Sequence, residues 1–102
     1  MFYLILTHDK AGAEALRDQY RADHYAYLTA HRQRILASGG LQNDAGDRFI
    51  GGMIVLQVDN RAEAEAFAAD DPFARAGLFA SVRIERWKPA FFNFENAASD
   101  PP

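Results

Sequence analysis

The order of elements is decided by the stretch IGGMIVLQV, residues 50–58. Its centre, residues 53–56, is too continuously apolar for a strand with one face in water, so we expect a buried strand over Ile50–Val58. The apolar run at residues 2–7 is also typical of a buried strand, and it ends at His8-Asp9-Lys10. A chain of 102 residues fits one domain built on these two strands.

A helix is expected between the two strands. Residues 13–37 contain no proline or glycine, and the apolar side chains recur at near-helical spacing: Leu16, Tyr20, Tyr27, Leu28, Ile35 and Leu36. We expect one long helix, with a break near Ala22-Asp23 left open. Ser38-Gly39-Gly40 would end it, because glycine tolerates the left-handed conformation that follows many helices. Residues 41–47 then hold either a short strand or a loop.

After the central strand, the sequence predicts a second helix and a last strand. Asn60 suits the N-cap of a helix over residues 61–70, which Pro72 interrupts before one further turn at residues 73–77. Residues 80–85 alternate between apolar and polar, as a half-buried strand does, and Trp87 closes that strand. The order β-α-(β)-β-α-β predicts an α+β, ferredoxin-like fold with helices on one face of an antiparallel sheet.

The second face of that sheet needs a cover, and a second copy of the chain or the C-terminal tail must supply it. We therefore expect a homodimer, with a sheet core drawn from Met53, Val55, Ala80, Val82 and Ile84. Three exposed phenylalanines would form an unusual apolar patch, so Phe91, Phe92 and Phe94 are expected to dock on the body or on the partner. Residues 95–102 are expected to be a disordered tail beyond a domain at residues 1–94.

Composition argues against several classes of partner. Eleven basic residues against 14 acidic ones give a net charge of −3, without the basic excess of a nucleic-acid-binding protein. No segment approaches the ~20 apolar residues of a membrane span, and the apolar start lacks a basic signal-peptide region. The chain has no cysteine, and its three histidines lack metal-ligand spacing. We expect a cytoplasmic protein with no metal and no cofactor.

Two groups of residues could carry chemistry. Arg17, Arg21, His24 and Leu28 share one face of a continuous helix, which is typical either of an anion site with a titratable group or of a solvated charged face. Asp71, directly before Pro72, is well placed to cap a helical turn, and its carboxylate keeps lone pairs for a histidine. Gly39-Gly40 and Gly51-Gly52 either let backbone amides approach a ligand or simply end a helix and open a strand.

Taken together, these segments resemble the YCII-related (YciI-like) family over residues 1–94. The matching features are the first strand running into His8-Asp9-Lys10, the helix residues Arg17, Arg21, His24 and Tyr27-Leu28, then Ser38-Gly39-Gly40, Gly52, Asp70-Asp71-Pro72-Phe73, Ala76-Gly77-Leu78 and Trp87-Lys88-Pro89. One departure is that the family often has glycine followed by proline where this chain has Gly39-Gly40.

The resemblance implies a dimeric α+β barrel with an active site centred on His24 and Asp71. Candidate substrate-binding residues around this pair are Arg17, Arg21, Gly39, Gly40 and Phe73. Relatives implicated in chemistry eliminate chloride from intermediates of aromatic degradation. A proton-transfer enzyme of the lyase or isomerase type is therefore expected, acting on a small anionic, aromatic-derived molecule. The alternatives are a non-catalytic module for ligand binding or dimerisation and a structural partner of a larger assembly.

Overall fold

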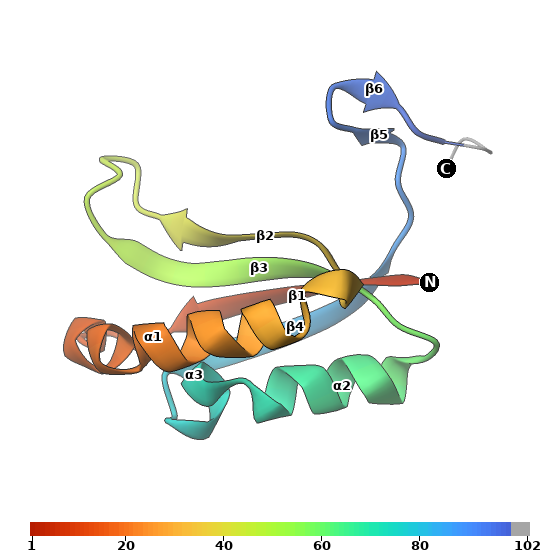
Figure 1. Ribbon diagram of the computed structural model, residues 1–102. Coiled ribbons are helices and arrows are strands. Elements are labelled where there is room, and N and C mark those ends of the chain that lie inside the picture. The colour runs from red at the N-terminus through yellow and green to blue at the C-terminus, as the bar shows by residue number, and fades with distance from the viewer. Residues whose placement is uncertain (99–102) are drawn as a thin grey trace.

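The computed structural model describes residues 1–98. It contains a four-stranded sheet with helices packed beside it (Figure 1). Along the chain the elements are β1 (Phe2–Asp9), α1 (Glu14–Ala30), a 3₁₀ turn (Arg32–Arg34), β2 (Ile35–Gln42), β3 (Phe49–Gln57), α2 (Arg61–Asp70), α3 (Pro72–Arg75), β4 (Phe79–Trp87), β5 (Phe91–Phe92) and β6 (Glu95–Asn96). The sheet order is β2-β3-β1-β4, and every neighbouring pair is antiparallel. The predicted α+β class with an antiparallel sheet is confirmed.

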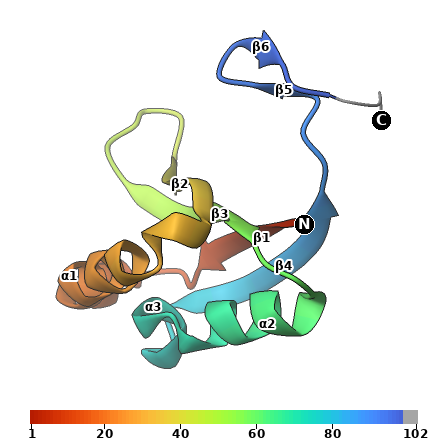
Figure 2. The ribbon, with the colours of Figure 1, turned by 45° about the vertical axis from the view of Figure 1, so that its right-hand side comes forward.

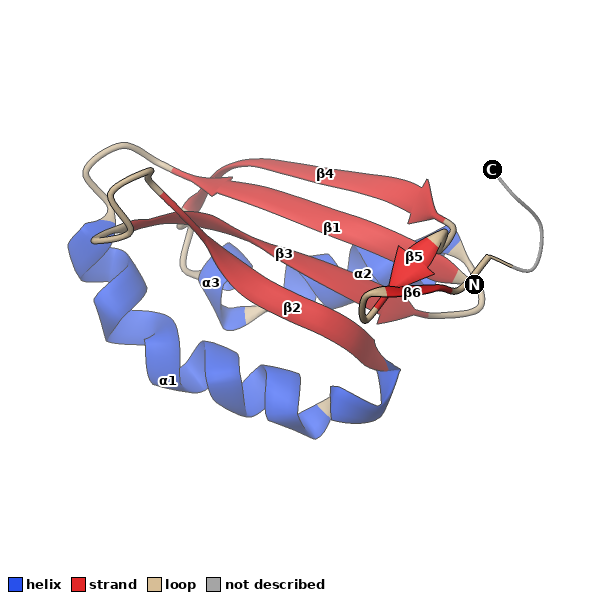
Figure 3. Ribbon diagram, turned by 90° about the horizontal axis from the view of Figure 1, so that it is seen from above, coloured by secondary structure: helices blue, strands red, loops and turns tan. Residues whose placement is uncertain are grey.

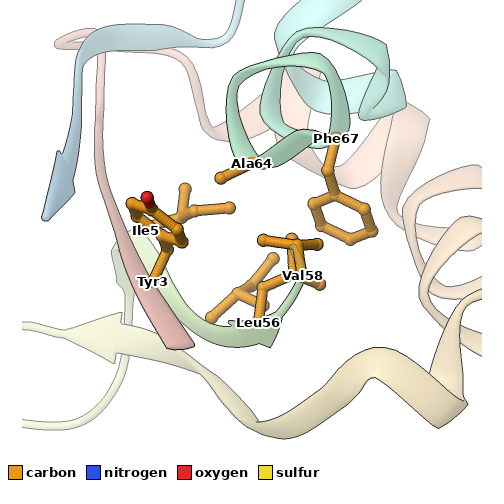
Figure 4. Close-up of a cluster of buried hydrophobic side chains, with 7 residues drawn as sticks. Tyr3, Ile5, Leu56, Val58, Ala64 and Phe67 are labelled. Carbon is orange, nitrogen blue, oxygen red and sulfur yellow. The ribbon is translucent and has the colours of Figure 1, made fainter. Parts of the chain in front are cut away.

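The helices α1, α2 and α3 all lie on one face of the sheet (Figures 1 and 2). The core fills the space between that face and α2. It joins Tyr3 and Ile5 of β1 and Leu56 of β3 to Ala64 and Phe67 of α2 (Figure 4). Helix α2 begins at the predicted residue, because the Asn60 side chain accepts a 2.9 Å hydrogen bond from the backbone N–H of Glu63. This cap satisfies one of the backbone N–H groups that have no partner within the helix at its start.

The predicted long helix over residues 13–37 is wrong at its C-terminal end. Helix α1 is continuous through Ala22-Asp23 but stops at Ala30, and residues 35–42 form the edge strand β2. Gly39-Gly40 therefore do not end a helix; they lie inside a strand, with Gly40 opposite Gly52. The backbone ladder with β3 satisfies the polar groups of this segment, and such tertiary pairing overrides the local helical spacing. Of residues 41–47, only Leu41 and Gln42 are in the strand.

The second face of the sheet, which we call the open face, has no helix over it (Figure 3). Leu4 lies opposite Val55, and Leu6 lies opposite Met53, so these four side chains share the open face. Ile5 is opposite both Ile54 and Ile84, which places Ile84 and, two residues before it, Val82 on the helix-covered side. The expected sheet core is thus divided between the two faces. Ala80 lies at the irregularity where β4 passes His8 and Asp9.

The C-terminal segment forms a small hairpin, β5–β6, that extends away from the body (Figures 1 and 2). Phe91 is 69% exposed, Phe92 is 43% exposed and Phe94 is fully exposed. These rings do not dock on the body of their own chain, and docking on a partner stays a prediction. Glu95–Asn96, expected in a disordered tail, pair with Phe91–Phe92 instead. Ala97 and Ala98, also in that predicted tail, donate backbone hydrogen bonds to the carbonyl of Ala90, and residues 99–102 lie outside the described residues.

Candidate active site

A histidine of α1 contacts an aspartate 47 positions later, at the junction of α2 and α3. Nδ1 of His24 lies 2.9 Å from Oδ1 of Asp71, and the two side chains are only 17% and 5% exposed. Because an ionised carboxylate only accepts hydrogen bonds, this contact is a donation from Nδ1–H to Asp71. In the neutral imidazole, Nε2 then has no proton and acts as the acceptor. The pair therefore presents a basic nitrogen held by a carboxylate.

Local backbone chemistry explains the position of Asp71. The residue is extended, with φ −57° and ψ 129°, as a following proline favours, and it separates α2 from α3. Its Oδ1 also accepts a 2.9 Å hydrogen bond from the backbone N–H of Phe73, so the predicted N-cap is confirmed. One oxygen therefore both caps α3 and holds His24.

Two aromatic rings contact the His24 imidazole. The imidazole stacks on Phe73, with centroids 4.1 Å apart and planes 16° from parallel. Tyr25 approaches the imidazole edge-on at 5.8 Å, and Phe79 packs edge-on against Phe73 at 6.2 Å. Stacking on one side and the Asp71 bond on another fix the orientation of the His24 ring.

The buried side chain of Arg17 links α1 to β1 and β3. Its guanidinium forms a bidentate pair with Asp9 at the end of β1, with Nε–Oδ2 at 2.7 Å and Nη2–Oδ1 at 3.1 Å. Nη2 also donates to the backbone carbonyl of Gly51 in β3, at 3.1 Å. The guanidinium carbon is 4.7 Å from the centroid of Phe73, the ring on which His24 stacks. Arg17 thus anchors the site more than it offers a free charge to a ligand.

Arg21 lies one turn further along α1 in a more open position. Its Nη2 is 2.6 Å from Oδ1 of Asp18, and both side chains are exposed. An exposed pair of this kind is weak and exchanges readily with water or with another anion. Arg21 is therefore the more accessible cation of the two.

All the catalytic and substrate-binding candidates from the sequence line one cavity of about 130 Å³. They are Arg17, Arg21, His24, Gly39, Gly40, Asp71 and Phe73. An apolar cavity of roughly 150 Å³ accepts benzene, so this space fits about one six-membered ring. The roles assigned to these residues stay predictions, but their meeting in one place is a property of the fold.

Sequence reasoning missed other residues of the cavity wall, among them Thr7, Tyr25, Phe49 and Phe79. Gly51 was noted only as half of a glycine pair. A Cβ at Gly51 would overlap the carbonyl oxygen of Thr7, so only glycine fits there. The run His8-Asp9-Lys10 also held the partner of Arg17, but nothing in a single sequence shows that Asp9 pairs with an arginine eight residues later.

Tyr27 lies three residues after His24 on α1, where it contacts α2. Its hydroxyl donates a 2.8 Å hydrogen bond to the carbonyl of Phe67. Burial, helped by the negative charges of Asp70 and Asp71, raises the pKa of Tyr27 to about 12. Tyr27 therefore stays protonated and is a fixed donor, not a base.

The other two histidines lie outside the pair. His8 is exposed on β1, and His31 packs against Tyr27 with centroids 4.7 Å apart. Within residues 1–98, no three histidine or acidic side chains gather in a way that would hold a metal ion. The same part of the chain contains no helix with the length and apolar character needed to cross a membrane.

The fold and the site define a small α+β protein with a histidine–aspartate pair in a ring-sized cavity. The chain belongs to the YCII-related family, whose model matches residues 1–88. It is 31% identical to protein YciI of Escherichia coli O6:H1 and 29% identical to an uncharacterized protein of Haemophilus influenzae. Each of these alignments covers 89% of this chain and 100% of the relative.

One protein of known structure with a similar fold is an enzyme. It is the 5-chloro-2-hydroxyhydroquinone dehydrochlorinase of Burkholderia phenoliruptrix AC1100, in complex with 2,5-dihydroxybenzoquinone. The TM-score is 0.80 at 30% identity, and the match covers 86% of this chain and 94% of the other.

Proposed function

We propose that this protein is a lyase-type proton-transfer enzyme that removes hydrogen chloride from a small hydroxylated ring. The observation that carries the proposal is the His24–Asp71 hydrogen bond of 2.9 Å at the wall of a cavity with room for about one ring. The likeness to a dehydrochlorinase at 30% identity supports the reaction class.

His24 is the proposed base. In the keto tautomer of such a ring, the carbon that bears chlorine is tetrahedral. Nε2 takes a proton from a ring hydroxyl, the electrons of that O–H bond form a C=O bond, and the ring double bond shifts to the chlorinated carbon. The C–Cl bond breaks, and chloride leaves with its electron pair. The net change is substrate to product plus H⁺ and Cl⁻, so no oxidant, reductant or cofactor is needed.

Asp71 is the proposed orienting residue. It holds Nδ1–H so that Nε2 is the acceptor, and its negative charge stabilises the imidazolium that forms, as a carboxylate does in hydrolytic triads. Phe73 supplies a flat apolar wall beside the base. Arg21, whose side chain is exposed, is the proposed contact for an anionic oxygen of the substrate ring. Arg17 instead stabilises the cavity wall through its hydrogen bonds to Asp9 and Gly51.

Chloride release tests the proposal. The purified protein is expected to release chloride from 5-chloro-2-hydroxyhydroquinone faster than buffer does. His24→Gln should lower the rate by roughly 10²–10⁴-fold, the usual contribution of a general base. His31→Gln is the matched control and should keep the wild-type rate.

Two outcomes would refute the proposed enzymatic function. One is chloride release no faster than in buffer, and the other is a His24→Gln variant as active as the wild type. Tight binding of 2,5-dihydroxybenzoquinone without any chloride release would favour the alternative, a non-catalytic ligand-binding module. A calorimetric titration with that quinone, run alongside the rate assay, separates these two functions.

A homodimer is part of the proposal. Leu4, Leu6 and Met53 lie half-buried on the open face of the sheet, and the phenylalanines of the β5–β6 hairpin are exposed. Burying an apolar sheet face against a second copy would form the dimeric α+β barrel and exceed the ~1,000 Å² of a stable interface.

A further inference from the structure

We propose that Phe49 sets the size of the ligand that the cavity accepts, and that Gly40 is the glycine that makes room for its ring. The inference rests on the proposed function, in that the cavity is taken as the binding site. It adds the residue that limits which rings can enter.

Phe49 and Gly40 lie on two paired strands. Phe49 opens β3 and pairs with Gln42, two residues beyond Gly40 on β2. A Cβ built on Gly40 would lie 2.5 Å from Cδ1 and 2.6 Å from Cε1 of Phe49. Carbon atoms do not approach so closely, so any side chain at position 40 would displace the ring of Phe49.

The neighbouring glycine provides a contrast. Gly39 lines the same cavity, yet a Cβ built there meets no heavy atom within 4 Å. The backbone of β2 therefore accepts a side chain at position 39 but not at position 40. The requirement for glycine at position 40 comes from the place that the Phe49 ring occupies.

Phe49 is the aromatic wall best placed to limit size. Its side chain is 39% exposed, whereas Phe73 on the same cavity is 2% exposed and packed against His24. The ring of Phe49 also lies 5.7 Å from the guanidinium carbon of Arg17. Shortening Phe49 therefore enlarges the cavity on the solvent side without disturbing His24 or Asp71.

The test compares a one-ring probe with a two-ring probe. Phenol and 2-naphthol are titrated into the protein, and binding is followed by NMR through the ring resonances of His24. The wild type is expected to bind phenol at least tenfold more tightly than 2-naphthol. Phe49→Ala should remove that preference or invert it, because the fused second ring then finds room.

The glycine pair supplies the matched control. Gly40→Ala should change the phenol preference at least threefold, because the ring of Phe49 must move, while Gly39→Ala, whose added methyl displaces no neighbouring atom, should change it by a smaller factor. Phe49→Leu, which keeps aliphatic bulk, should give an intermediate preference. Melting curves of all four variants show whether each is folded.

Several results would overturn the inference. They are a wild type that binds neither probe, an unchanged preference in Phe49→Ala, equal effects of the two glycine variants, and unfolding of both Phe49 variants. Neither probe contains chlorine, so the outcome is independent of catalysis. A Phe49-dependent size preference without chloride release would contradict the proposed reaction alone.

Discussion

Nδ1 of His24 and the backbone N–H of Phe73 both lie 2.9 Å from Oδ1 of Asp71. The His24–Asp71 contact therefore links the first helix of the chain to the start of α3 through an oxygen that the fold already needs. Capping α3 does not exclude the proposed orienting role of Asp71, since a carboxylate has about four lone-pair sites.

The first prediction concerns the buried ion pair of Arg17 and Asp9, whose side chains are 11% and 9% exposed. Arg17→Met leaves Asp9 as an uncompensated buried charge and should lower the free energy of unfolding by about 3 kcal/mol. Urea denaturation followed by circular dichroism measures it. Arg21→Met, which breaks only the exposed pair with Asp18, should cost less than about 1 kcal/mol. Equal effects of the two variants would refute the structural role of Arg17.

The second prediction concerns Tyr27 at high pH. Its pKa is 10.0 in the unfolded chain and about 12 in the fold, so above pH 10 the unfolded state loses a proton that the folded state keeps. Stability contributed by protonated Tyr27 is complete below pH 10 and is lost as the pH rises to 12. Tyr27→Phe should flatten this part of the stability curve relative to Tyr25→Phe, whose ring is exposed. Parallel curves for the two variants would show that Tyr27 is not responsible.

The third prediction concerns the C-terminal hairpin. Ending the chain after Pro89 removes Phe91, Phe92 and Phe94, which are exposed in the single chain. If these rings dock on a partner, the truncated protein should dissociate at micromolar concentrations where the full chain is a dimer. Light scattering reports the mass directly. Removing only residues 99–102 is the control and should leave the mass unchanged. A full-length chain that is itself monomeric would refute the proposed homodimer.

The sequence predicted which side chains lie on one face of the first helix better than it predicted where that helix ends. Spacing on one helix placed Arg17, Arg21 and His24 on a common face, and they do line one cavity. The continuous apolar run at residues 53–56 predicted the central strand, because a strand that is buried on both faces leaves a strong local pattern in the sequence.

Features that depend on contacts between residues far apart in the chain could not be predicted from local sequence patterns. The ladder between β2 and β3 turns Ile35–Gln42 into a strand, although the apolar spacing of that segment is near-helical. The pairing of Arg17 with Asp9 and the packing of Phe49 over Gly40 also depend on how strands are brought together. A single sequence carries no direct record of either contact.

The tautomer of His24 tests the central claim most directly. In the wild type, the ¹⁵N chemical shifts of the neutral imidazole should show the proton on Nδ1, leaving Nε2 as the base. Asp71→Asn keeps the cap, because asparagine caps about as well as aspartate, but its amide can donate to Nδ1. In that variant the proton should move to Nε2. A proton already on Nε2 in the wild type, or the same ¹⁵N shifts in both proteins, would contradict the account.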